Sequence, residues 1–181
     1  ENDINMIVAF MGNEVSVSAF ERGICIDVND CIGGEGPMGL TSSGDVPVAQ
    51  IAGYMRNNNM SYSGMETLLT KYSGVKQYYD FENVDALDRE SKANKKTNLA
   101  CIAVAYQTAK WIGSAAAVLK GDVDCIVLMG AASSSSTIIE SLIKRINKIA
   151  HVEVLGDYDI TSEMIKLSYD LGTNMCPVLE Y

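Results

Sequence analysis

The chain has 181 residues, of which 48% are hydrophobic, and a formal net charge of −9. A chain of this length is expected to form one domain, residues 1–181, that buries roughly 70% of the surface of the unfolded chain. The negative charge argues against binding to nucleic acid or to an anionic membrane, although main-chain amides can still bind a polyanion locally.

Three short apolar runs open the chain and predict an antiparallel meander of strands. They cover residues 6–11, 15–20 and 24–28, and the tight turns between them contain Gly12 and Gly23. A glycine turn in such a meander can offer bare main-chain N–H groups to the phosphates of a nucleotide. In this chain, however, Glu14 places a carboxylate in the first turn.

Residues 30–45 are rich in glycine and small polar residues, a composition typical of a loop. Both a surface connection and the lining of a cleft fit this loop. Helices are expected at 46–56, with Pro47 in the first turn, and at 61–72, with Ser63 as the cap and Glu66 as its capping-box partner. The charged stretch 82–96 is expected to form a solvated helix.

The second half of the chain predicts parallel strands with helical connections. Residues 99–119 have the spacing of a buried central helix, and the apolar run 125–130 is typical of a strand covered on both faces. A helix at 137–149, a strand at 151–155 and a helix at 161–172 follow. The order predicts an α/β fold of the ribonuclease-H-like type, with a mixed sheet in which an antiparallel βββ meander is followed by βαβα.

The junction between strand and helix at residues 128–136 is a second candidate site. Ligands of such sheets bind beyond the carboxyl ends of parallel strands, and a helix N-terminus there favours anions. Ser135 or Ser136 could instead serve only as the helix cap. A nucleotide site requires this junction and the turn at Gly12 to face one cleft, and we expect that arrangement.

The cysteines and the single histidine limit the kinds of metal or catalytic site that the chain can form. The five cysteines are widely spaced and include no C-x-x-C pair, which predicts reduced thiols and a cytoplasmic protein. The single histidine, His151, has no ligand-like partner near it in the sequence. Neither a zinc site nor a histidine-based catalytic triad is expected.

Three segments resemble the acetate and butyrate kinase family: AYQTAKWIGSAAAVLKGDVDCIVLMGAA (105–132), DVNDCIGGEGP (27–37) and PVLEY (177–181). The resemblance extends over residues 4–181 and corresponds to the C-terminal lobe of a family member, with the N-terminal lobe absent from this chain. It implies an actin-like ATPase domain, ATP and Mg²⁺ as cofactors, and a short-chain carboxylate such as butyrate as phosphoryl acceptor. It also implies a homodimer formed through this lobe.

The resemblance also implies roles for individual residues. Nucleotide contacts are expected from Gly12 and Asn13 on the phosphate side, from Asp80 near the adenosine, and from Gly130, Ala131, Ala132 and Ser133 at the second junction. The loop would contribute polar groups from Ser43, Gly44 and Asp45. No metal-binding residue is assigned.

Several positions depart from the family pattern. Phe10 replaces a histidine that would contact the transferred phosphoryl group, and Ser42 replaces an arginine. Glu14 and Ala131 stand where the family has glycines, Met129 replaces a threonine, and Glu82 replaces an arginine. Because phosphoryl transfer depends on positioned cations and N–H donors, these losses predict impaired catalysis.

The sequence leaves three functions open. The first is the nucleotide-binding lobe of a butyrate kinase, which makes butyryl phosphate and ADP from butyrate and ATP and is inactive as an isolated chain. An isolated lobe lacks the opposite wall of the cleft, which would position the acceptor and exclude water. The second is a catalytically degenerate paralogue used for dimerisation or nucleotide sensing, and the third is an interaction module that binds no nucleotide.

Overall fold

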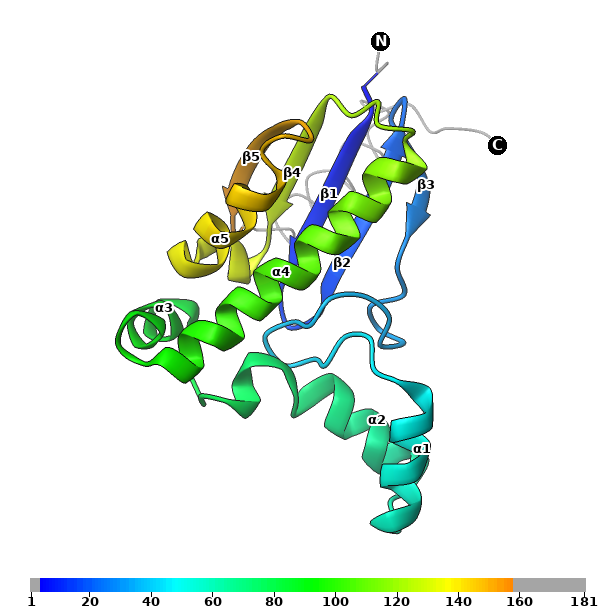
Figure 1. Cartoon of the computed structure of the whole chain (residues 1–181), viewed down its shortest axis with the longest axis vertical. Coiled ribbons are helices and arrows are strands. Elements are labelled where there is room, and N and C mark those ends of the chain that lie inside the picture. The colour runs from blue at the N-terminus through cyan, green and yellow to red at the C-terminus, as the bar shows by residue number, and fades with distance from the viewer. Residues whose placement is uncertain (1–3, 158–181) are drawn as a thin grey trace, which may run out of the picture.

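The structure is a computed structural model, and it describes residues 4–157. Five strands form one mixed sheet in the order β3-β2-β1-β4-β5, and one long helix lies across the sheet (Figure 1). The strands are β1 (Met6–Met11), β2 (Val15–Glu21), β3 (Ile24–Val28), β4 (Cys125–Met129) and β5 (His151–Gly156).

Pairing in the sheet follows the predicted pattern. Strand β2 pairs antiparallel with both β1 and β3, whereas β4 pairs parallel with both β1 and β5. The antiparallel meander extended by parallel strands is therefore confirmed. This order places the carboxyl ends of β1, β4 and β5 beside one another at one edge of the sheet, where ligands bind in folds of this class.

One face of the sheet packs into a single core with the helices α4 (Lys95–Val118) and α5 (Ser136–Ile146). Residues alternate along β1 and β4, so that Ile7, Ala9, Ile126 and Leu128 are fully buried. On α5 the buried residues recur every four positions, at 138, 142 and 146. Full burial of one such aliphatic side chain is worth about 1.5–3 kcal/mol, so this core holds the sheet edge in place.

Two helices extend away from this core as an arm (Figure 1). Helix α1 (Val48–Asn57) has no buried residue, and α2 (Tyr62–Lys71) buries only Met65. The predicted cap of α2 is wrong. Ser61 caps the helix, because its hydroxyl accepts a hydrogen bond from the Gly64 N–H, and Ser63 lies inside the first turn.

The charged stretch at 82–96 forms α3 (Val84–Ala93), which is not a fully solvated helix because Leu87 and Ser91 are buried. The central helix begins earlier than predicted, at Lys95, since the Asn94 side chain accepts hydrogen bonds from the first-turn amides. Two short 3₁₀ helices, η1 (Gly74–Gln77) and η2 (Ala131–Ser134), complete the described part. The helix predicted at 161–172 and the segment 177–181 lie outside the described residues.

The cysteines of residues 4–157 are free thiols. Burial, together with the negative charge of Asp88, raises the pKa of the Cys101 thiol to about 11, so this group stays protonated at neutral pH and is a poor nucleophile. Within the same range, none of the helices has both the length and the apolar character that a membrane span requires.

Candidate functional site

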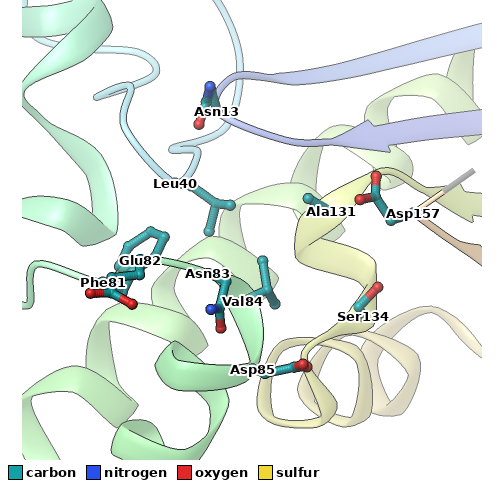
Figure 2. Close-up of a pocket in the computed structure, with 10 residues that line it drawn as sticks. All are labelled: Asn13, Leu40, Phe81, Glu82, Asn83, Val84, Asp85, Ala131, Ser134 and Asp157. Carbon is teal, nitrogen blue, oxygen red and sulfur yellow. The ribbon is translucent and has the colours of Figure 1, made fainter. Parts of the chain in front are cut away.

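A cavity of about 440 Å³ opens at the carboxyl ends of β1, β4 and β5 (Figure 2). Figure 2 shows residues of three walls around it: the β1–β2 turn with the following loop, the segment that enters α3, and the β4–α5 junction with the end of β5. The lining residues are Asn13, Leu40, Phe81, Glu82, Asn83, Val84, Asp85, Ala131, Ser134 and Asp157.

The ends of β1 and β4 touch each other through the backbone. Gly130 has φ of +90°, and a Cβ atom at this position would lie only 2.7 Å from the Met11 carbonyl oxygen. Glycine is required here by both the conformation and the space. The contact brings Asn13 and Ala131 to the same cavity, so the expectation that the two corners share one cleft is confirmed.

The turn between β1 and β2 uses its backbone groups to hold the loop that follows the meander. The Gly12 N–H donates to the Glu14 carbonyl (2.9 Å), and the Gly12 carbonyl accepts from the Leu40 N–H (3.1 Å). The Asn13 carbonyl accepts from the amides of Thr41 and Ser42, each at 3.1 Å. The expectation of a bare Gly12 amide is therefore wrong, since this N–H is already bonded within the turn.

The loop lines the cavity only through Leu40. Ser43, Gly44 and Asp45 are not among the lining residues, and the Asp45 carboxylate instead accepts from the Gly36 N–H (2.9 Å). Of the two interpretations of this loop, the lining of a cleft holds for Leu40. The structure does not bring the polar groups at 43–45 to the cavity.

Asn29 is a supporting residue that the sequence did not single out. Its buried side chain accepts from the Val17 N–H (2.6 Å) and donates to the carbonyls of Val15 (3.1 Å) and Glu35 (2.8 Å). It therefore fastens the start of the loop to β2. The only available signal was an amide side chain placed immediately after a strand, at the start of a glycine-rich loop.

The β4–α5 junction places one of its four predicted contact residues at the cavity, Ala131. The Gly130 N–H donates to the Gly156 carbonyl (2.8 Å), and both the N–H and the hydroxyl of Ser133 donate to the Gly130 carbonyl. Gly130, Ala132 and Ser133 do not line the cavity, and the hydrogen bonds of Gly130 and Ser133 instead fix the conformation of the junction. Ser134, which was not predicted, lines the cavity.

The side chain of Asp88, on α3, holds this junction in place through hydrogen bonds. Its carboxylate accepts from the hydroxyls of Ser135 (2.8 Å) and Ser136 (3.0 Å), from the Thr137 N–H (3.0 Å) and from the Lys92 ammonium (2.7 Å). Partial burial raises the pKa of Asp88, but the hydrogen bonds from these four residues outweigh it and hold the pKa well below its usual range. Asp88 is therefore a fixed negative charge.

The N-terminus of α5 is occupied by this carboxylate. Ser135 caps the helix by accepting from the Ile138 N–H (3.4 Å), and the Thr137 N–H is bonded to Asp88. A helix N-terminus favours an anion, and here the chain supplies that anion itself. The sequence left Ser135 and Ser136 open as caps, and the structure assigns the role to Ser135.

On the third wall, the segment that enters α3, the lining begins one residue after the predicted contact residue Asp80. Asp80 is exposed and forms an ion pair with Lys76 (3.4 Å), whereas its neighbours Phe81 and Glu82 line the cavity. Three acidic residues line the cavity, Glu82, Asp85 and Asp157, and the lining residues within 4–157 include no lysine, arginine or histidine.

Of the positions that depart from the family pattern, Ala131 and Glu82 line the cavity, whereas Phe10, Ser42, Glu14 and Met129 do not. Phe10 is on the half-buried face of β1, and Ser42 is buried in the loop. Glu14 is not a lining residue; its charge, after burial, helps to raise the pKa of the Cys31 thiol.

Residues 1–167 match the model of the Acetokinase family. The chain belongs to the acetokinase family. Butyrate kinase 2 of Clostridium acetobutylicum is 32% identical over 167 residues, which are 92% of this chain and 46% of that protein. Butyrate kinase 1 of the same organism is 33% identical over 87% of this chain and 44% of that protein.

Solved structures of acetokinase-family members share the fold. The acetate kinase of Porphyromonas gingivalis superposes with a TM-score of 0.76 at 22% identity, covering 92% of this chain and 50% of that one. The acetate kinase of Entamoeba histolytica gives 0.77 at 15% identity, covering 93% and 52%. The predicted ribonuclease-H-like, actin-like ATPase fold is confirmed. The chain spans about half the length of the curated relatives it matches.

The family implies the use of Mg²⁺, and the described residues offer a few oxygen ligands for it but no complete metal site. No group of three or more His, Cys, Asp or Glu in residues 4–157 could hold a metal ion alone. The cavity carboxylates are nevertheless oxygen donors of the kind Mg²⁺ prefers, and Mg²⁺ usually binds through one or two carboxylates plus substrate phosphates. The donor set fits an ion that arrives with the nucleotide.

Proposed function

We propose that this chain is the nucleotide-binding lobe of a butyrate-kinase-like ATP:carboxylate phosphotransferase, which converts butyrate and ATP to butyryl phosphate and ADP. The observation that carries the proposal is the single cavity shared by Asn13 and Ala131 at the carboxyl ends of three parallel strands. This is the position at which sheets of this class bind ligands.

The cavity offers distinct surfaces for the parts of a nucleotide. Leu40, Phe81 and Val84 provide apolar and aromatic contact for a base, and Ser134 provides a hydroxyl. Asn13, in the turn between β1 and β2, would contact the phosphates, as the family resemblance implies. Mg²⁺, when bound with the nucleotide, would neutralise phosphate charge and would be held by Asp157 or Asp85.

The isolated chain is proposed to be inactive in phosphoryl transfer. The reaction requires cationic and N–H donors around the transferred group. Phe10 and Ser42 occupy the positions where the family pattern has a histidine and an arginine, and the Gly12 amide is bonded internally. A second lobe, beyond this chain, would supply the opposite wall of the cleft and position the acceptor.

A degenerate paralogue that senses nucleotides or forms a dimer is the second candidate. The inward-bonded donors and the acidic lining of the cavity favour binding without turnover. The edge strand β3 exposes Ile24 (69%), Ile26 (45%) and Val28 (54%), which supports contact with a second copy of the chain. In either form we place the protein in the cytoplasm as a homodimer.

Binding and catalysis are tested separately. Calorimetric titration with adenosine and with Mg-ATP should give saturable binding that is lost in Ala131→Trp, which fills the cavity, and retained in Ala49→Trp on the exposed face of α1. An acyl hydroxamate assay with butyrate and Mg-ATP should give no product above the blank. Absence of binding for every adenine ligand would remove the proposal, and turnover that disappears on Gly12→Val would contradict the inactivity.

A further inference from the structure

We infer that the cavity selects its ligand by charge and binds an uncharged purine nucleoside, such as adenosine, more tightly than the corresponding nucleotides free of metal. The inference rests on the proposal that this cavity is the nucleotide site. What it adds is the preference of the site for the uncharged nucleoside over metal-free nucleotides, which follows from where the donors and charges of this chain lie.

Three main-chain donors of the two corners are already used. The amides of Gly12, Gly130 and Ser133 donate to carbonyls of Glu14, Gly156 and Gly130, respectively. Phosphate sites in related folds depend on such amides pointing at the ligand. To bind a phosphate through these three amides, the chain would first have to break hydrogen bonds that hold the turn and the corner together.

The N-terminus of α5 does not provide an alternative site for a phosphate. The α5 N-terminus, which would otherwise attract an anion, is bonded to the Asp88 carboxylate through Thr137, Ser135 and Ser136. The low pKa of Asp88 keeps its charge in place at all physiological pH values. A phosphate near this terminus would meet a carboxylate that already occupies the favourable position.

The side chains that line the cavity add repulsion. Glu82, Asp85 and Asp157 carry negative charge, and the lining residues of the described part carry no positive charge. Lys76 and Lys92 are paired with Asp80 and Asp88. Each phosphate added to a ligand therefore increases the repulsion.

The same groups suit a nucleoside. Carboxylates are good acceptors for the hydroxyls of a ribose, as in dinucleotide sites where an acidic residue binds the ribose. Phe81 can contact the base face, and Leu40 and Val84 add apolar surface (Figure 2). A volume of about 440 Å³ lies in the range of small-molecule sites.

The test is a binding series with adenosine, AMP, ADP and ATP, each measured by equilibrium dialysis in EDTA. We expect affinity to fall with each phosphate, and adenosine to bind at least about tenfold more tightly than ATP. Because salt screens charge at partly exposed sites, the ratio should shrink between low and high ionic strength. ATP binding as tightly as adenosine in EDTA overturns the inference and leaves the proposed function intact.

A charge-neutral variant identifies the groups responsible. The double variant Glu82→Gln with Asp157→Asn should reduce the adenosine-to-ATP ratio by several fold, whereas Asp27→Asn on the distant edge strand β3 should leave it unchanged. Equal ratios in wild type and the double variant overturn the assignment to these carboxylates. Failure of all four ligands to bind removes the proposed function and, with it, this inference.

Discussion

The two corners that meet at the cavity are held by different kinds of bond. The β1–β2 corner fastens its loop through the backbone carbonyls of Gly12 and Asn13. The β4–α5 corner is fastened by one side chain, the Asp88 carboxylate, which bonds two hydroxyls and an amide of the junction. The first corner is therefore tolerant of side-chain changes, whereas the second is sensitive to sequence and to pH.

The difference explains how phosphate-site residues can change without loss of the fold. Substituting a side chain at the first corner leaves its backbone hydrogen bonds in place, so Phe10, Asn13 and Glu14 are free to vary. At the second corner, a change at Asp88 would unpair the hydroxyls of Ser135 and Ser136 and the Thr137 amide at once. The following predictions test this contrast.

The largest effect is expected where the corners touch. Gly130→Val should destabilise the protein by about 3 kcal/mol or more, because the new side chain would collide with the Met11 backbone and adopt an unfavourable positive φ. Urea unfolding followed by circular dichroism measures this loss. Gly113→Ala, in open space on α4, is the control and should stabilise by about 0.5–1 kcal/mol. Equal effects of the two substitutions would contradict the contact.

Removing the charge at the second corner should have the next largest effect. Asp88→Asn should cost about 2 kcal/mol of unfolding free energy, since the amide cannot accept from all the donors that converge on this site. Asp27→Asn, exposed on β3, is the matched control and should stay within about 0.5 kcal/mol of wild type. A loss no greater than that of the control would show that Asp88 is not a structural lock.

The same carboxylate predicts an acid dependence. Because the folded-state pKa of Asp88 is lower than its ordinary value of 3.8, its contribution is present above that pH and is lost as pH falls further toward the folded-state pKa. The stability gap between wild type and Asp88→Asn should therefore narrow below about pH 4. Unfolding curves at pH 7, 5, 4 and 3 measure the gap, and a gap that does not change would contradict the assignment.

The smallest effect is expected at the first corner. Asn13→Ala should change the unfolding free energy by less than about 0.5 kcal/mol, because the loop is bonded to the carbonyl of Asn13 and this carbonyl is kept in the variant. A loss comparable to that of Asp88→Asn would remove the contrast between the corners. The measurement is the same urea titration.

Elements with a clear apolar period were predictable from the sequence. The first two strands of the meander, the central helix and the run at 125–130 each bury residues at the spacing their pattern indicates. The third strand, β3, forms where its pattern predicts it but buries none of its residues. Boundaries marked by polar residues were less predictable. Asn94 begins α4 ahead of its first apolar residues, and Ser61 rather than Ser63 begins α2.

The candidate site was predictable in place but not in detail. Local motifs located the two corners, because glycine turns at strand ends have a recognisable composition. The bonds that use up the Gly12 and Gly130 amides involve carbonyl groups whose positions only the fold determines. Asp88 lies 47 residues from Ser135 in the sequence, and a charged stretch alone could not reveal that partner.

The internal bonds of the Gly12 and Gly130 amides have a consequence for the history of such a lobe. Both donors are paired within the chain, so the fold does not depend on a bound phosphate to satisfy them. Selection for folding alone would then preserve the shape of the cleft long after its chemistry had changed. Shape and catalysis can therefore diverge in this lobe, each under its own evolutionary constraint.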